Sequence, residues 1–158
     1  DLDKVAGPGR NLAGAKENFA KLACVQCHKL GKDGYAYGPD LTDALKRMKN
    51  DRAALLTEIL EPSKVVADRY KNYVFELNDG EEMVGMIVKE DAESVTVQTG
   101  PSDSLIQNVK KSAIKTRTLQ PSSQMPLGLM NMLSKEQILD LLAYIESGGH
   151  APAHDHVH

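Results

Sequence analysis

The spacing of apolar residues changes twice along the chain, and each change predicts a different kind of structure. Before residue 70, apolar positions recur at intervals of three and four, which predicts helices at about 13–24 and in the stretch NDRAALLTEILEP. Between about 70 and 119 they alternate with polar positions in short runs, which predicts four or five strands. Helical spacing returns in a last segment at about 135–147.

The ends of the later helices carry recognisable signals. Asp51 is the expected N-cap of the second helix, and Pro62 ends it. Ser134 and Gln137 form a capping-box pattern before the last helix, and the Gly-Gly pair at 148–149 ends it. The apolar stripes of these two helices are expected at Leu55, Leu56, Ile59 and Leu60, and at Ile138, Leu141, Leu142 and Ile145.

Turn and break signals divide the strand-like region into short segments. The stretch YVFELN places Tyr73, Phe75 and Leu77 on one face of a strand, and the Asn-Asp-Gly sequence at 78–80 predicts a hairpin turn. A Gly-Pro break at 100–101 leads to weaker apolar runs. Short strands with tight turns predict a small antiparallel sheet or barrel, and the region resembles an SH3-like or Sm-like barrel.

Composition and charge narrow the classes of protein. The chain has 158 residues, of which 41% are hydrophobic and 26% charged, which is typical of one globular domain or a domain with a small insert. A net charge of −3 without clustered Lys and Arg argues against a nucleic-acid partner. No apolar run approaches the ~18 residues of a membrane span. The N-terminal stretch DLDKVAGPGR lacks a signal-peptide pattern, so an export signal would have been removed, or the chain comes from a longer one.

The chemistry of the chain centres on LACVQCHKLG at 22–31, which holds its two cysteines, Cys24 and Cys27, and His28. A disulfide would close a tiny loop and stabilise little. A thioredoxin-like redox pair would follow a strand, whereas a helix is expected here. A zinc site needs a second ligand pair, but no other Cys exists and the remaining histidines all lie in the last nine residues.

The fourth interpretation of Cys-x-x-Cys-His is a covalently attached c-type haem. Cys24 and Cys27 lie about one helical turn apart, so both sulfurs can reach the two vinyl groups at one porphyrin edge. His28 follows directly and is placed to bind the iron through Nε2. This interpretation uses all three residues at the spacing that they have.

A methionine is the common sixth ligand of haem iron in electron carriers. Met125 lies among Pro121, Ser122, Ser123 and Pro126, which predicts a loop that can project the side chain onto a flat ring. The other five methionines are expected to pack or to lie in strand-like or polar surroundings, and they are Met48, Met83, Met86, Met130 and Met132.

These motifs together resemble a class I c-type cytochrome. CVQCH, then GPDL at 38–41, a Met-Pro loop and a terminal amphipathic helix carry the resemblance. LLTEILEPSKVVADRY and LNDGEEMVGMIVKEDAESVTVQ make the chain most similar to the planctomycete-type haem-binding domain with a β-rich insert, over about residues 14–148. The implied fold is α+β: an all-α class I core of about four helices around one haem, with a small antiparallel β-sheet or barrel insert.

The resemblance also implies roles for individual residues. Cys24 and Cys27 would be the thioether anchors, His28 the proximal iron ligand and Met125 the distal one. The carbonyl of Pro39 would accept a hydrogen bond from Nδ1–H of His28, which fixes the ring orientation.

Two further features concern the surroundings of the haem. The chain lacks the Trp that often holds a haem propionate, so Tyr35 or Tyr37 would donate instead. The last helix of the family crosses the first, which predicts a contact between Phe19 and Tyr144.

The expected organisation is a haem domain of residues 12–69 and 120–148, interrupted by a β-rich insert at 70–119. Residues 1–11 and 149–158 are expected to be flexible termini. The tail HAPAHDHVH has four His in nine residues, which is typical either of a metal-binding tract or of an unstructured end.

The expected function is that of a monohaem c-type cytochrome with His/Met ligation, which transfers electrons alone or as the module of a larger redox protein. The alternative is a haem-based sensing module whose distal Met is displaced by a ligand. No nucleophile–base pair or carboxylate dyad stands out, so an enzyme is not expected. The resemblance implies redox partner proteins and a periplasmic or otherwise exported location.

Overall fold

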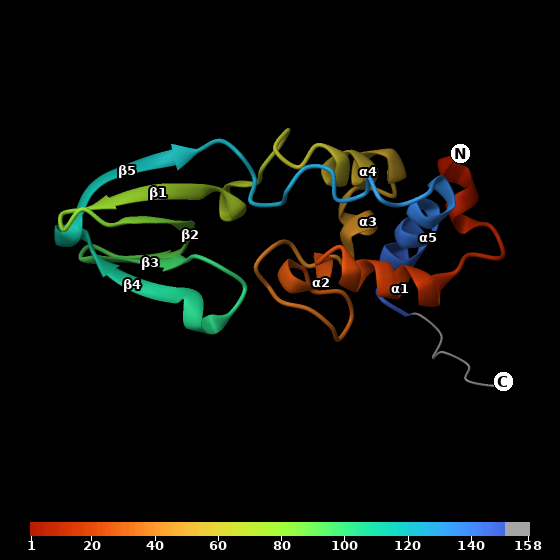
Figure 1. The fold of residues 1–158 in the computed structure, drawn as a ribbon, viewed down its shortest axis with the longest axis horizontal. Coiled ribbons are helices and arrows are strands. Elements are labelled where there is room, and N and C mark those ends of the chain that lie inside the picture. Colours follow the sequence, from red (N-terminus) through yellow and green to blue (C-terminus); the bar gives the residue numbers. More distant parts are fainter. Residues whose placement is uncertain (151–158) are drawn as a thin grey trace. The chain divides into compact units, whose positions relative to one another are not determined.

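The computed structural model describes residues 1–150, and the chain forms two compact units. The helical unit contains Asp1–Glu61 together with the segment from Leu127 onward, and the sheet unit is Pro62–Pro126. The chain therefore passes between units at 61/62 and 126/127, whereas the sequence predicted changes at 69/70 and 119/120. Figure 1 shows the elements of each unit along the chain.

The helical unit has short and long helices. None of the helices within residues 1–150 is both long and apolar enough to cross a membrane. Residues expected to form a flexible lead-in include a 3-10 helix, Leu2–Ala6, whose Val5 is buried. The α-helices are α1 (Leu12–Lys21), α2 (Cys24–Cys27), α3 (Ala44–Arg47), α4 (Arg52–Leu60) and α5 (Lys135–Glu146).

The predicted capping signals of the later helices are confirmed. The Asp51 side chain accepts a hydrogen bond from the backbone N–H of Ala54 at 3.0 Å. Before α5, Ser134 and Gln137 form a reciprocal capping box. Gly148 follows α5 with a φ of +72°, which a side chain would disfavour, so the helix ends where the sequence predicted.

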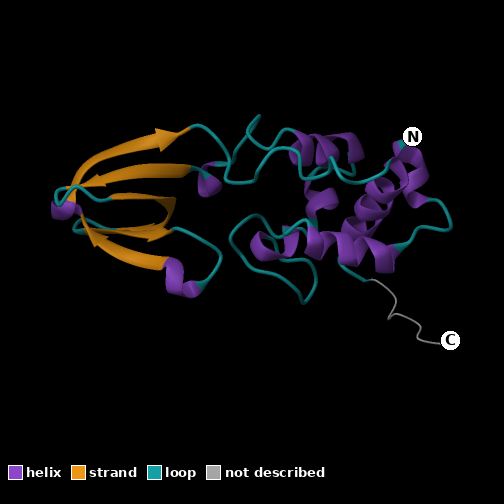
Figure 2. Cartoon of the chain, viewed as in Figure 1, coloured by secondary structure: helices purple, strands orange, loops and turns teal. Residues whose placement is uncertain are grey.

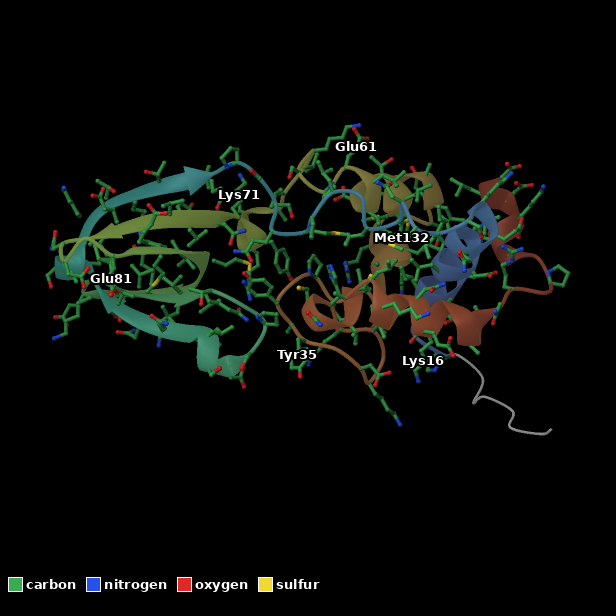
Figure 3. All side chains as sticks on the ribbon, viewed as in Figure 1. Lys16, Tyr35, Glu61, Lys71, Glu81 and Met132 are labelled. Carbon is green, nitrogen blue, oxygen red and sulfur yellow. The ribbon has the colours of Figure 1, made fainter. Side chains whose placement is uncertain are left out.

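The core of the helical unit lies between α1 and α5. The rings of Phe19 and Tyr144 meet edge to face at 5.8 Å between centroids, as predicted, a contact worth about 1 kcal/mol beyond its buried area. The stripe of α5 is confirmed, but Leu60 of α4 is 47% exposed and was wrongly placed in a stripe. Met132, labelled in Figure 3, was expected to pack and is 89% exposed. The buried core residues are Val5, Ala15, Phe19, Leu30, Ala44, Leu55, Met130, Leu139, Leu141, Leu142, Tyr144 and Ile145.

The sheet unit is one antiparallel sheet with strand order β4-β3-β2-β1-β5, drawn in orange in Figure 2. Tyr73, Phe75 and Leu77 share the face that packs onto the core of this unit, as predicted. The Asn-Asp-Gly turn at 78–80 joins the first two strands, and a 3-10 turn at Lys111–Ala113 leads to the last. The strands are β1 (Asn72–Leu77), β2 (Glu82–Glu90), β3 (Ser94–Gln98), β4 (Ile106–Lys110) and β5 (Ile114–Gln120).

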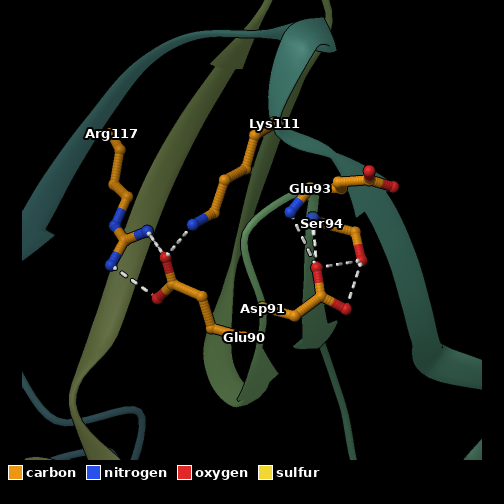
Figure 4. Close-up of polar contacts among 6 residues, drawn as sticks. All are labelled: Glu90, Asp91, Glu93, Ser94, Lys111 and Arg117. Atoms are coloured by element: carbon orange, nitrogen blue, oxygen red, sulfur yellow. Dashed lines mark hydrogen bonds and ion pairs between the residues drawn. The ribbon is translucent and has the colours of Figure 1, made fainter.

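An ion-pair network ties three parts of the sheet unit together, as Figure 4 shows. Glu90 at the end of β2 accepts two hydrogen bonds from the guanidinium of Arg117 on β5, at 3.0 and 3.1 Å. It also pairs with Lys111 at 2.9 Å. Arg117 lies over the ring of Tyr73, 5.3 Å from its centroid. Because β2 and β5 are not neighbours in the strand order, this network joins strands that backbone pairing does not connect.

The all-helical class I core implied by the resemblance is wrong, whereas the antiparallel sheet predicted beside it is present. A class I cytochrome c core is all-helical, whereas the described residues form an α+β structure with a five-stranded antiparallel sheet. Of their five α-helices, only three have seven or more residues. One physical reason is local: Ala23 has a left-handed backbone (φ +64°), which breaks the predicted first helix into α1 and the four-residue α2.

The carboxylate of Glu90 predicts how the chain responds to acid. Its bonds to Arg117 and Lys111 lower the pKa of Glu90 to about 2. A lowered pKa stabilises the fold above the unfolded value of about 4.5 and loses that contribution as the pH falls towards 2. We expect Glu90→Gln to lower the free energy of unfolding at pH 7 by about 1 kcal/mol, and to flatten its decline below pH 4.5. Urea unfolding of the full chain between pH 2 and 7 measures both effects.

The matched control is Glu93→Gln, which removes a nearby charge whose side chain makes none of the bonds drawn in Figure 4. An equal acid response in the two variants would contradict the role of the network.

Candidate functional site

The two cysteines lie at the two ends of α2. The left-handed turn at Ala23 redirects the chain after α1, and α2 then begins at Cys24 and ends at Cys27. Residues three apart on a helix are neighbours on its surface, so the two thiols share one side of this turn. A non-glycine residue in this conformation costs about 1 kcal/mol or more, and such strain is found preferentially at functional sites.

Both cysteines are free thiols in surroundings that disfavour ionisation. Burial raises the pKa of Cys24 to about 11, an effect that its backbone hydrogen bond partly offsets. Burial also raises the pKa of Cys27. Reactive cysteines of redox pairs have lowered pKa values, and they follow a strand in thioredoxin-like folds. Because α1 precedes this pair and both pKa values are raised, the arrangement does not support a redox pair.

His28 leaves α2 with an extended backbone and is held by a single carbonyl. Its Nδ1 lies 2.7 Å from the backbone oxygen of Pro39, the hydrogen bond that the resemblance implied. Burial lowers the pKa of His28, and the Pro39 bond opposes that effect only in part. The imidazole is therefore neutral at pH 7 with its proton on Nδ1, which leaves the lone pair of Nε2 for a ligand.

The loop after α2 is built around His28. A Cβ added at Gly38 would lie 2.6 Å from Cε1 of His28 and 2.9 Å from its Nδ1, so only glycine lets the backbone approach the ring this closely. Gly34 has a φ of +96°, and a Cβ there would overlap the carbonyl oxygen of His28. The N–H of Gly38 donates to the carbonyl of Cys27 at 2.5 Å. Gly34 and Gly38 therefore let the backbone of this loop lie directly against His28.

The two tyrosines of this loop differ in their surroundings. Tyr35, labelled in Figure 3, is 55% exposed. Tyr37 is only 6% exposed, and its hydroxyl has no hydrogen-bond partner within residues 1–150. Burial, with a smaller contribution from Cys27, raises the pKa of Tyr37 to about 12. A buried neutral hydroxyl of this kind needs an acceptor, since leaving it unsatisfied costs about 1–3 kcal/mol.

The zinc interpretation finds no cluster to support it in the described part of the chain. Among residues 1–150, no three His, Cys, Asp or Glu side chains gather closely enough to hold a metal ion. The metal-binding tract considered for the tail falls on residues 151–158, apart from His150, and so lies outside the described residues.

The proposed distal ligand belongs to the sheet unit. Met125 is half-buried in the loop after β5, and its N–H donates to Oγ of Ser123 at 3.1 Å. Met130 is buried in the helical core, which confirms that it packs. The assignment of Met125 as the iron ligand stays a prediction.

Sequence reasoning missed two residues of the site. Ala23 carries no sequence signal, because its left-handed conformation follows from how α1 and α2 pack rather than from its own preference. Gly38 could have been found: it precedes Pro39, and a glycine beside the carbonyl that receives the imidazole is a candidate for close backbone approach. No family model matches the sequence, and a search of curated proteins found no match either.

The close contact between Gly38 and His28 predicts that a methyl group added at residue 38 displaces the imidazole. We expect Gly38→Ala to push the imidazole away from Pro39 and to lower the free energy of unfolding by about 1–3 kcal/mol, as overpacking does. Chemical denaturation measures the loss, and the NMR signals of the His28 ring report its displacement. Gly100→Ala is the control, because a Cβ there meets only the flexible end of Leu105. Unchanged His28 signals in Gly38→Ala would refute this description of the site.

Proposed function

We propose that this protein binds one haem covalently through Cys24 and Cys27, with His28 and Met125 as axial ligands, and transfers single electrons to and from partner proteins. The proposal concerns the donor set and not the class I fold. The observation that carries it is the hydrogen bond of 2.7 Å from Nδ1 of His28 to Pro39, directly after two free thiols on one helical turn.

The donor set fits a c-type haem. Both thiols are free, and each can add across a vinyl C=C bond, with sulfur bonding one carbon and the thiol hydrogen passing to the other. This addition consumes no oxidant, so it suits thiols that burial keeps protonated. The neutral imidazole presents Nε2, and its bond to Pro39 makes the ring a better donor and restricts its rotation.

Other residues of the loop around His28 also fit a bound haem. Tyr37 offers a buried hydroxyl without a partner in the described chain, which suits a carboxylate acceptor such as a haem propionate. The backbone at Gly38 lies close against the ring of His28, and the backbone at Gly34 lies close against the His28 carbonyl, so both restrict the residue. A fixed ligand geometry suits electron transfer, because little rearrangement then accompanies a change in iron charge.

Bound haem would supply the Fe(II)/Fe(III) couple, and His/Met ligation favours the reduced state. His28 and Met125 would hold the iron at both axial positions, which disfavours bond chemistry at the metal. We therefore propose a carrier rather than an enzyme, which works with redox partner proteins. Covalent attachment of this kind takes place outside the cytoplasm in bacteria, so we propose an exported location.

Covalent attachment is tested by intact mass and a pyridine haemochrome spectrum of the full chain, matured with the haem-attachment machinery. We expect the mass of one added haem and a spectrum typical of two saturated vinyl groups. Cys24→Ala and Cys27→Ala are each expected to shift the haemochrome band towards that of a single thioether. A colourless product with the mass of the bare chain would refute the proposal.

The distal ligand is tested separately by Met125→Ala. We expect this change to abolish the weak long-wavelength band of methionine bound to ferric iron and to lower the reduction potential, because the thioether stabilises Fe(II). Met132→Ala is the control, since its side chain is exposed. A high-spin spectrum of the unchanged protein would instead favour a ligand-binding sensor, and loss of the band in Met130→Ala but not in Met125→Ala would refute the assignment.

A further inference from the structure

We infer that Asn72 and Gln124 are positioning residues for Met125, so that the sheet unit serves to hold and orient the distal ligand. This inference rests on the proposed function. It depends only on contacts within Pro62–Pro126, and it gives the strand-rich part of the chain a role in the redox site.

Asn72 is a rigid attachment point. It is the first residue of β1, which is paired on both sides, opposite Met86 of β2 and Gln120 of β5. Successive side chains of a strand point to opposite faces, so Asn72 lies on the face opposite to Tyr73 and Phe75. Yet Asn72 is only 1% exposed. A carboxamide buried at this position on a central strand has little freedom to move.

The loop that carries Met125 is hydrogen-bonded to Asn72. Nε2 of Gln124 donates to Oδ1 of Asn72 at 2.6 Å. One residue earlier, the N–H of Ser123 donates to Oγ of Ser63 at 2.9 Å, and Oγ of Ser123 accepts from the N–H of Met125 at 3.1 Å. The two residues before Met125 are therefore fixed to two other segments of the sheet unit.

The chain on either side of the loop restricts it further. Pro121 and Pro126 bracket the loop, and each ring fixes its own φ and limits the residue before it. Met125 itself precedes Pro126, so its backbone favours an extended conformation. The loop thus has few conformations to lose when the thioether binds a metal, which strengthens binding.

The bond between Gln124 and Asn72 is energetically important because the Asn72 side chain has few other hydrogen-bond partners. Its Nδ2 has no hydrogen-bond partner among the described residues, nor does the buried Oε1 of Gln120 opposite. Loss of Gln124 would leave the buried Oδ1 of Asn72 unsatisfied as well. The chain thus buries a costly carboxamide at a strand position that bonds to the Met125 loop, which is what a positioning role requires.

The test uses Gln124→Leu in the full, haem-loaded chain, because the side chain keeps a similar volume and loses the amide that bonds Asn72. We expect the association rate of CO with the ferrous protein to rise about tenfold, the equivalent of one hydrogen bond, and the methionine–iron band to weaken. In the haem-free full chain, the ¹³C-methyl signal of Met125 should show a lower order parameter. Asn72→Ala should act in the same direction.

The matched control is Asn78→Ala, which removes the bond of 2.8 Å from Nδ2 of Asn78 to the carbonyl of Ser112, away from the loop. It should lower stability without changing CO binding or the Met125 methyl signal. An unchanged methyl order parameter in both Gln124→Leu and Asn72→Ala would overturn the inference. Failure of the proposed function is distinct, because a chain without covalent haem would still show the methyl effect.

Discussion

The hydrogen bond between Nδ1 of His28 and the carbonyl of Pro39 is the constraint on which the proposed site depends. It selects one tautomer of a half-buried imidazole and leaves the lone pair on Nε2. Without it, the ring would be an ordinary titratable side chain beside two thiols. The close approach of Gly38 makes the bond possible, since a larger residue would separate the ring from the carbonyl.

In the sheet unit, too, polar side chains hold together elements that the strand pairing does not connect. Glu90 joins β2 to Arg117 of β5, with which β2 is not paired, and Asn72 holds the loop after β5 through Gln124. Charged and amide groups at these positions cost free energy to desolvate, and they recover it only when the partner is in place. Each contact therefore specifies a geometry more than it adds stability.

Much of the local structure could be predicted from sequence, because it depends on short-range signals. The capping pattern at Ser134 and Gln137, the hairpin turn at 78–80 and the alternation in β1 are all local, and all are present. The cysteine–histidine spacing likewise points to Cys24, Cys27 and His28, and their role stays a prediction. What failed was the global inference: resemblance in motifs was extended to an all-helical core, whereas the packing of the chain gives an α+β structure with a left-handed break at Ala23. Such a break depends on tertiary contacts, which no local pattern contains.

The interrupted path of the helical unit has a consequence for how the protein is made. Arg10 and Glu136, which bond at 2.6 Å, are 126 residues apart in sequence, and the whole sheet lies between the two halves of this unit. During synthesis, the segment with Cys24, Cys27 and His28 emerges long before the helix that completes its core. Until α5 docks, both sulfurs belong to a segment whose hydrophobic core is incomplete. Closing the core by so distant a contact is slow, so the two thiols stay accessible until late in folding.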